Sequence, residues 1–487
     1  MDLLWITGVL VGGYVIVFGI VRNFNNWYYG FKEGNKGNPL PPGDMGWPII
    51  GNMPTFLKTY IYGDPNSFIA NLSSRYGKIG IYKTHLFWSP AIVVSAPETC
   101  KQILTDDEHF ILGYPKTSKT LGGRRSLHSI TRAEHKRVRR LVTPVLNGHE
   151  ALSSYIVHVE NNAINSLEEW VSMNRPIDIL AELRTVVFKF ITHTFIGADD
   201  NDAIVREMEI LFTDLHAGLI SLNINLPGFA FHRALQSRKR LVKILQAVLD
   251  KKRADANVKG KTGGKDMMDS LMALEDEDGR KLGDEDIIDL LLLFLLAGHE
   301  SSVLGTLWGM IFLTDHSRVF QKAKEEQEMI IKNRPPDQKG LTFKEIKQMG
   351  YLAKVIDEML RQTNMVFANF REAIADVNIN GYFIPKGWKV FAWSRGVHMD
   401  PEIYSDPLEF NPERWDNVRP RPGASIPFGL GSRYCPGSDL AKLEISIFLH
   451  YFLLNYRLER VNPKCPVTYL TVPRPTDNCL ARVIKVA

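Results

Sequence analysis

The sequence predicts a mainly α-helical protein, with a single large helical domain and a smaller β portion, preceded by one N-terminal transmembrane helix. Residues 3–21 form an uncharged apolar run. Residues 131–360 carry mostly helical patterns. The chain beyond them alternates short apolar stretches with Asn-Gly and Lys-Gly turn signals, which is typical of short strands.

The apolar run at residues 3–21 is predicted to be a membrane anchor. As a helix it would span roughly 28 Å, close to the hydrocarbon thickness of a bilayer. Trp27 and Tyr28 follow the run and suit the membrane interface. A cleaved signal peptide is the alternative, but acidic Asp2, the length of the run and the lack of a small-residue cleavage site favour an anchor. Arg22 and the lysines after it predict a cytosolic body.

The anchor accordingly covers residues 1–22, and residues 23–52 are predicted to be an interfacial segment followed by a proline-rich hinge. Pro41 and Pro42 in this hinge exclude helix and stiffen the backbone. A size of about 150 residues per domain would suggest three domains. No linker or internal repeat divides the remainder, so residues 53–487 are predicted to form one domain.

Three local patterns in this domain are specific enough to place elements. Residues 79–86 and 90–96 are predicted to be strands. Thr131 and Glu134 match a capping box at the start of a helix. Residues 283–316 are predicted to be a long helix buried in the core, because apolar residues occupy nearly all faces, while polar residues in its middle argue against a second membrane span.

Composition excludes several classes of protein. The net charge is +5 with no long basic block, so dedicated binding of nucleic acid is not expected. The chain has four cysteines and no Cys-x-x-Cys pair, which argues against a zinc ribbon, a thioredoxin-like redox pair or a disulfide framework. Unpaired thiols in a reducing compartment are expected.

The stretch PFGLGSRYCPG places Cys435 directly before a predicted helix. Free N–H groups and the dipole at a helix start favour a thiolate, and Arg433 adds positive potential. Gly431 and Gly437 let the backbone approach a flat group, against which Phe428 can pack. These residues suit a thiolate bound to a metal in a planar cofactor; the alternative is a structural cysteine in a tight turn.

This stretch resembles the haem-binding loop of the cytochrome P450 superfamily. The family also has a helical Glu-x-x-Arg, matched by Glu358 and Arg361 in VIDEMLRQ, and an arginine matched by Arg414 in FNPERW. Alone, the Glu-x-x-Arg pair would be read as an exposed ion pair. The resemblance implies the cytochrome P450 fold, haem b with Cys435 as the axial ligand of the iron, and a structural triad that locks the cysteine loop.

The segment AGHESS resembles the family's oxygen-activating pattern. Oxygen activation needs protons while bulk water stays out, and the acid Glu300 beside the alcohol Ser301 can relay them. The Ser301 hydroxyl can bond back to the Ala297 carbonyl four residues earlier, and Gly298 leaves space for dioxygen. Serine replaces the commoner threonine of the family, so hydroxyl placement is less rigid. A helix kink with a solvated glutamate is the alternative.

The helix that begins near residue 131 resembles the family segment that contacts a haem propionate. Arg139 can hold a propionate through a forked pair of hydrogen bonds. His135 stands where the family commonly has tryptophan, four residues before it. Arg371 is a third expected propionate contact. Lys136, Arg137 and Arg140 on the same helix suggest either a basic surface for an acidic electron donor or a solvated face.

Further segments resemble the plant group that contains ent-kaurenoic acid oxidase and triterpene oxidases; these include NGHEALS, NMVFANFREA and INGYFIPKGWKV. By position, residues 110–128 and 215–232 are expected to form a lid over an apolar substrate pocket. The residues expected to face the substrate are Leu296, Ala297, Val366, Phe367, Ala368, Thr471 and Val472.

The resemblance implies a haem-thiolate monooxygenase anchored in the endoplasmic reticulum membrane as a single-pass protein. Its electrons would come from NADPH through a reductase, and it would use O2 to hydroxylate an unactivated C–H bond of a terpenoid, with triterpenes of the β-amyrin or cucurbitadienol type favoured. The alternatives are an ent-kaurenoic acid oxidase, a haem-thiolate isomerase or dehydratase that needs no O2, and a non-enzymatic haem sensor.

Overall fold

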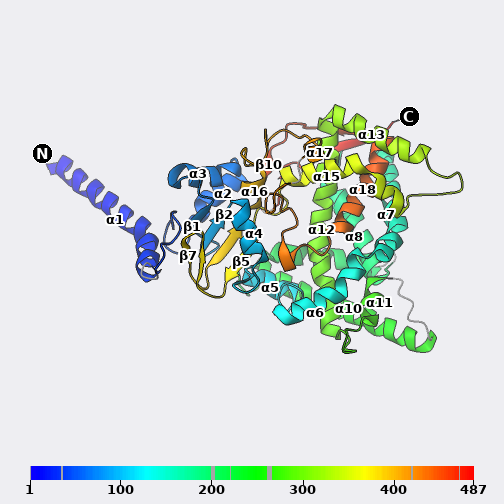
Figure 1. The fold of residues 1–487 in the computed structure, drawn as a ribbon, viewed down its shortest axis with the longest axis horizontal. Coiled ribbons are helices and arrows are strands. Elements are labelled where there is room, and N and C mark those ends of the chain that lie inside the picture. The colour runs from blue at the N-terminus through cyan, green and yellow to red at the C-terminus, as the bar shows by residue number, and fades with distance from the viewer. Residues whose placement is uncertain are drawn as a thin grey trace.

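The computed structural model describes residues 2–33, 37–198, 203–219, 221–259, 266–417, 420–470 and 472–486. The strands of its largest sheet gather on one side of the body, next to the N-terminal helix α1 (Asp2–Glu33), which projects away from the body. The longer helices form the opposite and larger part (Figure 1). This arrangement confirms the predicted mainly α-helical fold with a smaller β portion.

The helices after α1 account for most of the body. They are α2 (Met53–Ile61), α3 (Asn66–Tyr76), α4 (Pro97–Thr105), α5 (Lys116–Gly122), α6 (Arg132–Asn147), α7 (His149–Ser172), α8 (Ile179–Ile196), α9 (Ala203–Gly218), α10 (Ala230–Lys259), α11 (Met267–Ala273), α12 (Asp284–Asp315), α13 (Ser317–Lys332), α14 (Phe343–Gln348), α15 (Gly350–Thr363), α16 (Ser394–His398), α17 (Arg414–Asn417) and α18 (Ser438–Asn455).

The largest sheet has the strand order β1-β2-β8-β5-β3, in which only β2 and β8 pair in parallel. The order β4-β12-β9 makes a second sheet, and β6-β7 and β10-β11 are two-stranded. The strands are β1 (Ile81–Leu86), β2 (Ser89–Val94), β3 (Phe110–Leu112), β4 (Ile177–Asp178), β5 (Asn369–Ala373), β6 (Val377–Ile379), β7 (Tyr382–Ile384), β8 (Lys389–Ala392), β9 (Tyr456–Arg460), β10 (Val467–Thr468), β11 (Arg474–Pro475) and β12 (Leu480–Lys485).

Local sequence explains several of these elements. The two strands predicted in residues 79–96 are present as β1 and β2, with slightly shorter bounds. The Asn380-Gly381 pair between β6 and β7 has positive φ at both residues, 51° and 80°, which is what a two-residue hairpin turn requires. The capping box predicted at Thr131 is absent, because its side chain makes no capping bond and Glu134 instead accepts hydrogen bonds from Arg137.

Helix α12 is the centre of the helical part, as its apolar composition predicted. It has the length and composition to cross a membrane, but 78% of its apolar window is buried inside the protein. Asp286 accepts the Gly283 N–H at its start, over 3.0 Å. A Cβ atom at Gly305 or Gly309 would lie 2.5 Å or 2.7 Å from side chains of α18, so these glycines let α12 and α18 pack closely.

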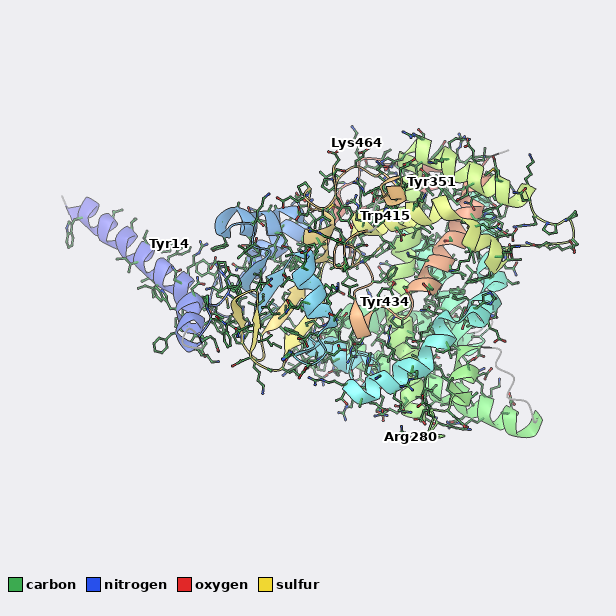
Figure 2. The ribbon with its side chains drawn as sticks, viewed as in Figure 1. Tyr14, Arg280, Tyr351, Trp415, Tyr434 and Lys464 are labelled. Atoms are coloured by element: carbon green, nitrogen blue, oxygen red, sulfur yellow. The ribbon has the colours of Figure 1, made fainter. Side chains whose placement is uncertain are left out.

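Helix α1 extends beyond the predicted anchor boundary at residue 22. Large apolar side chains in its projecting part are exposed to solvent, including Trp5 and Tyr14 (Figure 2). Its last turns are bound to the body, since the Asn25 amide donates to the Trp47 carbonyl over 2.6 Å and the Tyr29 ring packs edge-on against Trp388 at 5.6 Å. The segment after residue 22, expected to be interfacial, therefore begins as helix and is anchored to the sheet.

Candidate active site

The loop that carries Cys435 has a defined backbone. The Cys435 N–H donates to the Phe428 carbonyl over 2.9 Å, and residues 431–433 form a single 3-10 turn. Gly431 has φ 71°, and a Cβ atom there would lie 2.6 Å from the Leu104 carbonyl oxygen. Gly431 therefore serves close packing of the loop on α4 and does not line the cavity, where the sequence had suggested a role beside a cofactor.

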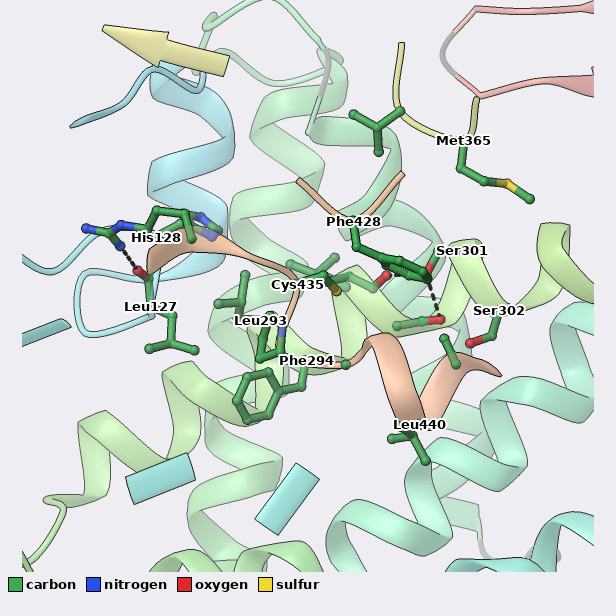
Figure 3. Close-up of a pocket in the computed structure, with 18 of the residues that line it drawn as sticks. Leu127, His128, Leu293, Phe294, Ser301, Ser302, Met365, Phe428, Cys435 and Leu440 are labelled. Atoms are coloured by element: carbon green, nitrogen blue, oxygen red, sulfur yellow. Dashed lines mark hydrogen bonds between the residues drawn. The ribbon is translucent and has the colours of Figure 1, made fainter. Parts of the chain in front are cut away.

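Cys435 borders a cavity of about 490 Å³ that α12 also lines (Figure 3). A Cβ atom at Gly437 would meet no atom within 4 Å, so this glycine does leave room beside the sulfur. The structure brings most of the predicted site residues together around the cavity. Those that line it are His135, Arg139, Leu296, Ala297, Gly298, Ser301, Val366, Phe428, Arg433, Cys435 and Gly437.

Several residues expected to face the substrate lie elsewhere. Phe367 packs in an aromatic cluster against Tyr60 and Trp393, at 5.5 Å and 5.1 Å between ring centroids. Ala368 is fully buried in the same cluster, and Val472 packs on the main helical core. These three side chains are taken up by packing and do not line the cavity. Thr471 lies outside the described residues.

Three guanidinium groups lie beside the sulfur end of the cavity. Arg433 donates to the Leu127 carbonyl over 2.8 Å (Figure 3), and buried Arg371 donates only to backbone carbonyls. Within the described part of the chain, no carboxylate lies within 4.0 Å of these two groups or of Arg139. Burial lowers the pKa of Arg433 to about 10; Asp107 partly offsets this, while Arg371 and Arg139 add to it. Such a buried excess of cations needs an anion.

The residues around Cys435 fit haem. A half-buried cysteine, an adjoining space and guanidinium groups without carboxylate partners match an iron ligand, a ring and two carboxylate propionates. Burial lowers the pKa of His135 to about 4, and Arg433 and Arg139 also lower it. Arg371 lies behind the lining and not in it.

The free thiol of Cys435 is not acidic by itself. Burial raises its pKa, which outweighs the opposing effects of the Gly437 N–H and Arg139. The sequence had suggested that the helix start and Arg433 would stabilise the thiolate, but here desolvation is the larger effect. A bound iron would supply the missing charge, because coordination deprotonates a thiol.

On α12, Ser301 behaves as predicted and Glu300 does not. The Ser301 hydroxyl donates to the Ala297 carbonyl over 2.7 Å and faces the cavity (Figure 3). Glu300 points away from the cavity and accepts two hydrogen bonds from Arg184 of α8, at 2.6 Å and 3.1 Å. The two side chains leave the helix on different faces, so the structure does not assemble the acid–alcohol relay in this conformation.

The electrostatics of Glu300 follow from this pair. Burial would raise its pKa, but the two hydrogen bonds and the charge of Arg184 hold the pKa below its ordinary value. Glu300 is therefore a carboxylate near neutral pH. The Arg184 carbonyl also accepts a hydrogen bond from the His299 ring over 2.8 Å, which connects α8 to the same turn of α12.

The predicted structural triad is present. Glu358 is fully buried and accepts two hydrogen bonds from Arg361, at 2.8 Å and 2.9 Å, and one from Arg414 at 3.3 Å. The Trp415 indole and the Asn411 N–H add two more donors, at 3.1 Å and 3.2 Å. The pair is therefore not the exposed ion pair that its spacing alone would have suggested.

Sequence patterns did not single out several other residues near the site. Arg184 and His398 act from distant segments, and neither belongs to a recognisable motif. Glu444 lines the cavity, burial raises its pKa to about 8, and its Oε2 atom has no hydrogen-bond partner among the described residues.

The two predicted lid segments, residues 110–128 and 215–232, contact each other. The hydroxyls of Thr117 and Ser118 both donate to the Leu219 carbonyl over 3.1 Å.

The basic residues of α6 are less available than their sequence suggested. Arg137 pairs with Glu134 and Asp276, and Arg140 pairs with Glu277. Of the three, only exposed Lys136 has no acidic partner among the described residues.

The helical fold, the cysteine loop at the cavity, the buried Glu–Arg–Arg triad and the guanidinium groups without carboxylate partners together define a haem-thiolate protein. The cytochrome P450 family matches residues 41–477, and the chain belongs to this family. It is a monooxygenase of that family.

Similar proteins indicate the plant group within the family to which this chain is related. The chain is 53% identical to a 7,8-epoxymelianol synthase of Ailanthus altissima, over 99% of this chain and 97% of that protein. It is 52% identical to β-amyrin 11-oxidase of Glycyrrhiza uralensis over the whole of both chains, and 49% identical to ent-kaurenoic acid oxidase 2 of Arabidopsis thaliana over 99% and 98%. These matches confirm the predicted plant group.

A solved structure agrees with the fold. The retinoic acid-bound cyanobacterial CYP120A1 superposes with a TM-score of 0.81 at 27% identity, covering 92% of this chain and all of that one.

Replacing Glu358 with alanine should destabilise the protein strongly, because Arg361 and Arg414 would be left as buried cations without an anion. The expected cost is about 3–5 kcal/mol, measured by thermal unfolding together with haem retention. Asp416→Asn is the matched control, since it removes the more exposed pair with Lys354 and should cost about 0–1 kcal/mol. Equal effects of the two changes would contradict a central role for the triad.

Replacing Arg184 with leucine should make stability depend on pH in a defined way. The pKa of Glu300 is depressed in the native protein, so the pair stabilises the fold above the unfolded pKa of about 4.3 and loses this effect as pH falls. The melting temperature of Arg184→Leu should therefore lag furthest behind the wild type near pH 7, and the lag should shrink as pH falls below about 4. Adding Glu300→Gln should remove this pH dependence; a deficit that is constant with pH would refute the assignment.

Proposed function

We propose that the protein hydroxylates an unactivated C–H bond of a plant triterpene, of the β-amyrin or cucurbitadienol type. The observation that carries this proposal is the cavity of about 490 Å³ next to Cys435, whose wall away from the sulfur is largely apolar. Its apolar lining includes Ile191, Phe195, Leu293, Phe294, Met365 and Val366. Such a wall suits a polycyclic hydrocarbon skeleton, and relatives with names of triterpenoid enzymes support the class.

Haem b bound at Cys435 would supply the oxygen chemistry, with O2 as the oxidant and electrons from NADPH through a reductase. Arg139, Arg433 and His135 would bind its propionates, and Arg371 would support them from behind. The Ser301 hydroxyl, bonded to the Ala297 carbonyl, is placed to hold a proton donor or a water molecule at the cavity wall. Glu300 could join this relay only after release from Arg184.

The ent-kaurenoic acid oxidase activity is the nearest alternative, because relatives of that name are 46% to 49% identical to this chain. An acidic substrate needs a cation in the apolar part of the cavity. Among the described lining residues the arginines are Arg139 and Arg433, and both are assigned to haem. This distribution favours a neutral substrate.

We also propose that α1 anchors the protein in the endoplasmic reticulum membrane, with the body on the cytosolic side. The projecting part of α1 is apolar and exposed, which has a high cost in water and a low cost in lipid. Lys136 of α6 then offers a small basic contact for the electron-donating partner.

Deleting residues 2–17 should release the protein from membranes while leaving the haem domain folded, because it keeps the contacts that join α1 to the body, which begin with the Phe18 ring against Trp47 at 4.7 Å. The measurement is the distribution between membrane and soluble fractions after carbonate extraction, with the reduced carbon monoxide spectrum reporting on the fold. Replacing Tyr29 with alanine in the full chain is the control and should leave the protein in the membrane. A deletion variant that remains fully membrane-bound would contradict α1 as the main anchor.

Co-expression with a plant reductase in yeast that makes β-amyrin, cucurbitadienol or ent-kaurenoic acid should yield an oxidised triterpene, identified by mass spectrometry and NMR. Cys435→Ser should abolish the product, because the axial thiolate is lost. Conversion of only the diterpene acid would sink the triterpene proposal. Product formation in microsomes without NADPH would instead support the isomerase or dehydratase alternative, and absence of any product or substrate-induced spectral shift would favour a sensor.

A further inference from the structure

His398, at the end of α16, lies between the cysteine loop and the wall of the cavity. Its side chain is fully buried, and both ring nitrogens have partners. The Ile426 N–H donates to Nε2 over 2.9 Å, and Nδ1 lies 2.7 Å from the Asn364 side-chain oxygen.

These two contacts determine the tautomer. Burial lowers the pKa of His398 to about 3, and Arg361 and Arg395 lower it further, so the ring is neutral and carries one N–H. Nε2 accepts from Ile426 and cannot carry that hydrogen. The hydrogen is therefore on Nδ1, which donates to Asn364.

On its Nε2 side, His398 contacts the loop that carries Cys435. Ile426 lies two residues before Phe428, whose carbonyl accepts the Cys435 N–H over 2.9 Å. The Ile426 carbonyl in turn accepts the Gly429 N–H over 3.1 Å. The imidazole thus bonds the backbone from which the turn around Cys435 is built.

On its Nδ1 side, His398 contacts the wall of the cavity. Asn364 ends α15 in the left-handed conformation, with φ 51°, and lines the cavity together with Met365 and Val366. Its amide donates to the Arg361 carbonyl over 2.8 Å, and the Arg361 guanidinium donates to the His398 carbonyl over 2.8 Å. A closed ring of hydrogen bonds therefore joins this cap to the triad.

We propose that His398 is a positioning residue that sets the cysteine loop and the cavity wall at residues 364–366 relative to each other. It touches neither haem nor substrate and acts through Ile426 on one side and Asn364 on the other. The part of the proposal that concerns the Cys435 loop rests on membership of the family. Only the part that concerns the cavity wall at Asn364 rests on the proposed oxidation. One imidazole accepts from one loop and donates to the other, so a change at either loop is felt at the second.

Two variants separate the two sides. The longer His398→Gln side chain can place its oxygen near the Nε2 position and keep the bond from Ile426, whereas His398→Asn can place its amide near the Nδ1 position and keep the bond to Asn364. The probe is clotrimazole, an apolar azole whose binding in the cavity shifts the haem spectrum without turnover. The reduced carbon monoxide spectrum reports thiolate ligation separately.

His398→Gln should retain thiolate ligation and bind clotrimazole about tenfold more weakly, as expected for loss of one neutral hydrogen bond. His398→Asn should bind the azole within about twofold of the wild type but convert part of the haem to the thiol-ligated spectrum. Asn364→Gly removes the same substrate-side bond and tolerates positive φ, so it should reproduce the azole defect and should not add to it in the double variant with His398→Gln.

Loss of melting temperature alone, equal in both His398 variants and without this division between azole affinity and thiolate spectrum, would overturn the proposal. An Asn364→Gly protein with wild-type azole affinity would overturn it as well, even if the His398 variants fail to fold. Neither readout requires oxidation of a terpenoid, so an error in the proposed substrate would leave this test unaffected.

Discussion

The buried carboxylate of Glu358 is the interaction on which the site depends. It lies at the junction of α15 with the irregular chain before the cysteine loop, and the forked guanidinium of Arg361 and the side chain of Arg414 neutralise it. A buried ion that loses its partner costs several kcal/mol, so these three groups can be accommodated only together. Arg361 also donates a hydrogen bond to the His398 carbonyl. His398 in turn contacts the loop of Cys435, so the constraint extends to that loop.

A second balance of charge operates at the cavity. Arg371 is buried and Arg139 and Arg433 are half-buried, all without carboxylate partners in the described part of the chain, and burial raises the pKa of the Cys435 thiol. Each of these groups is costly by itself. Bound haem would compensate these charges together, with Arg139 and Arg433 holding its propionates and Cys435 its iron. The protein alone therefore has positive charges at the cavity without anionic partners, as expected of a protein that binds an anionic cofactor.

Helix α12 divides two environments on opposite faces of a single turn. Ser301 faces the cavity, whereas Glu300 is paired with Arg184 on the side of α8. This division keeps a charged carboxylate away from the apolar part of the cavity. Under the proposed function, Glu300 can take part in proton supply only after its ion pair with Arg184 opens.

The sequence by itself determined the local elements and the position of the cysteine loop. The glycine-rich loop with Cys435, the back-bonded Ser301, the Glu358–Arg361 pair and the all-round apolar α12 are encoded by short-range spacing, and the structure contains each of them. Tertiary structure alone decided where side chains point across distant segments. Glu300 pairs with Arg184, Phe367 packs in an aromatic cluster and Gly431 packs against α4. These contacts could not be read from local spacing, because the residues that neutralise a buried charge or surround a buried ring lie far away in the chain.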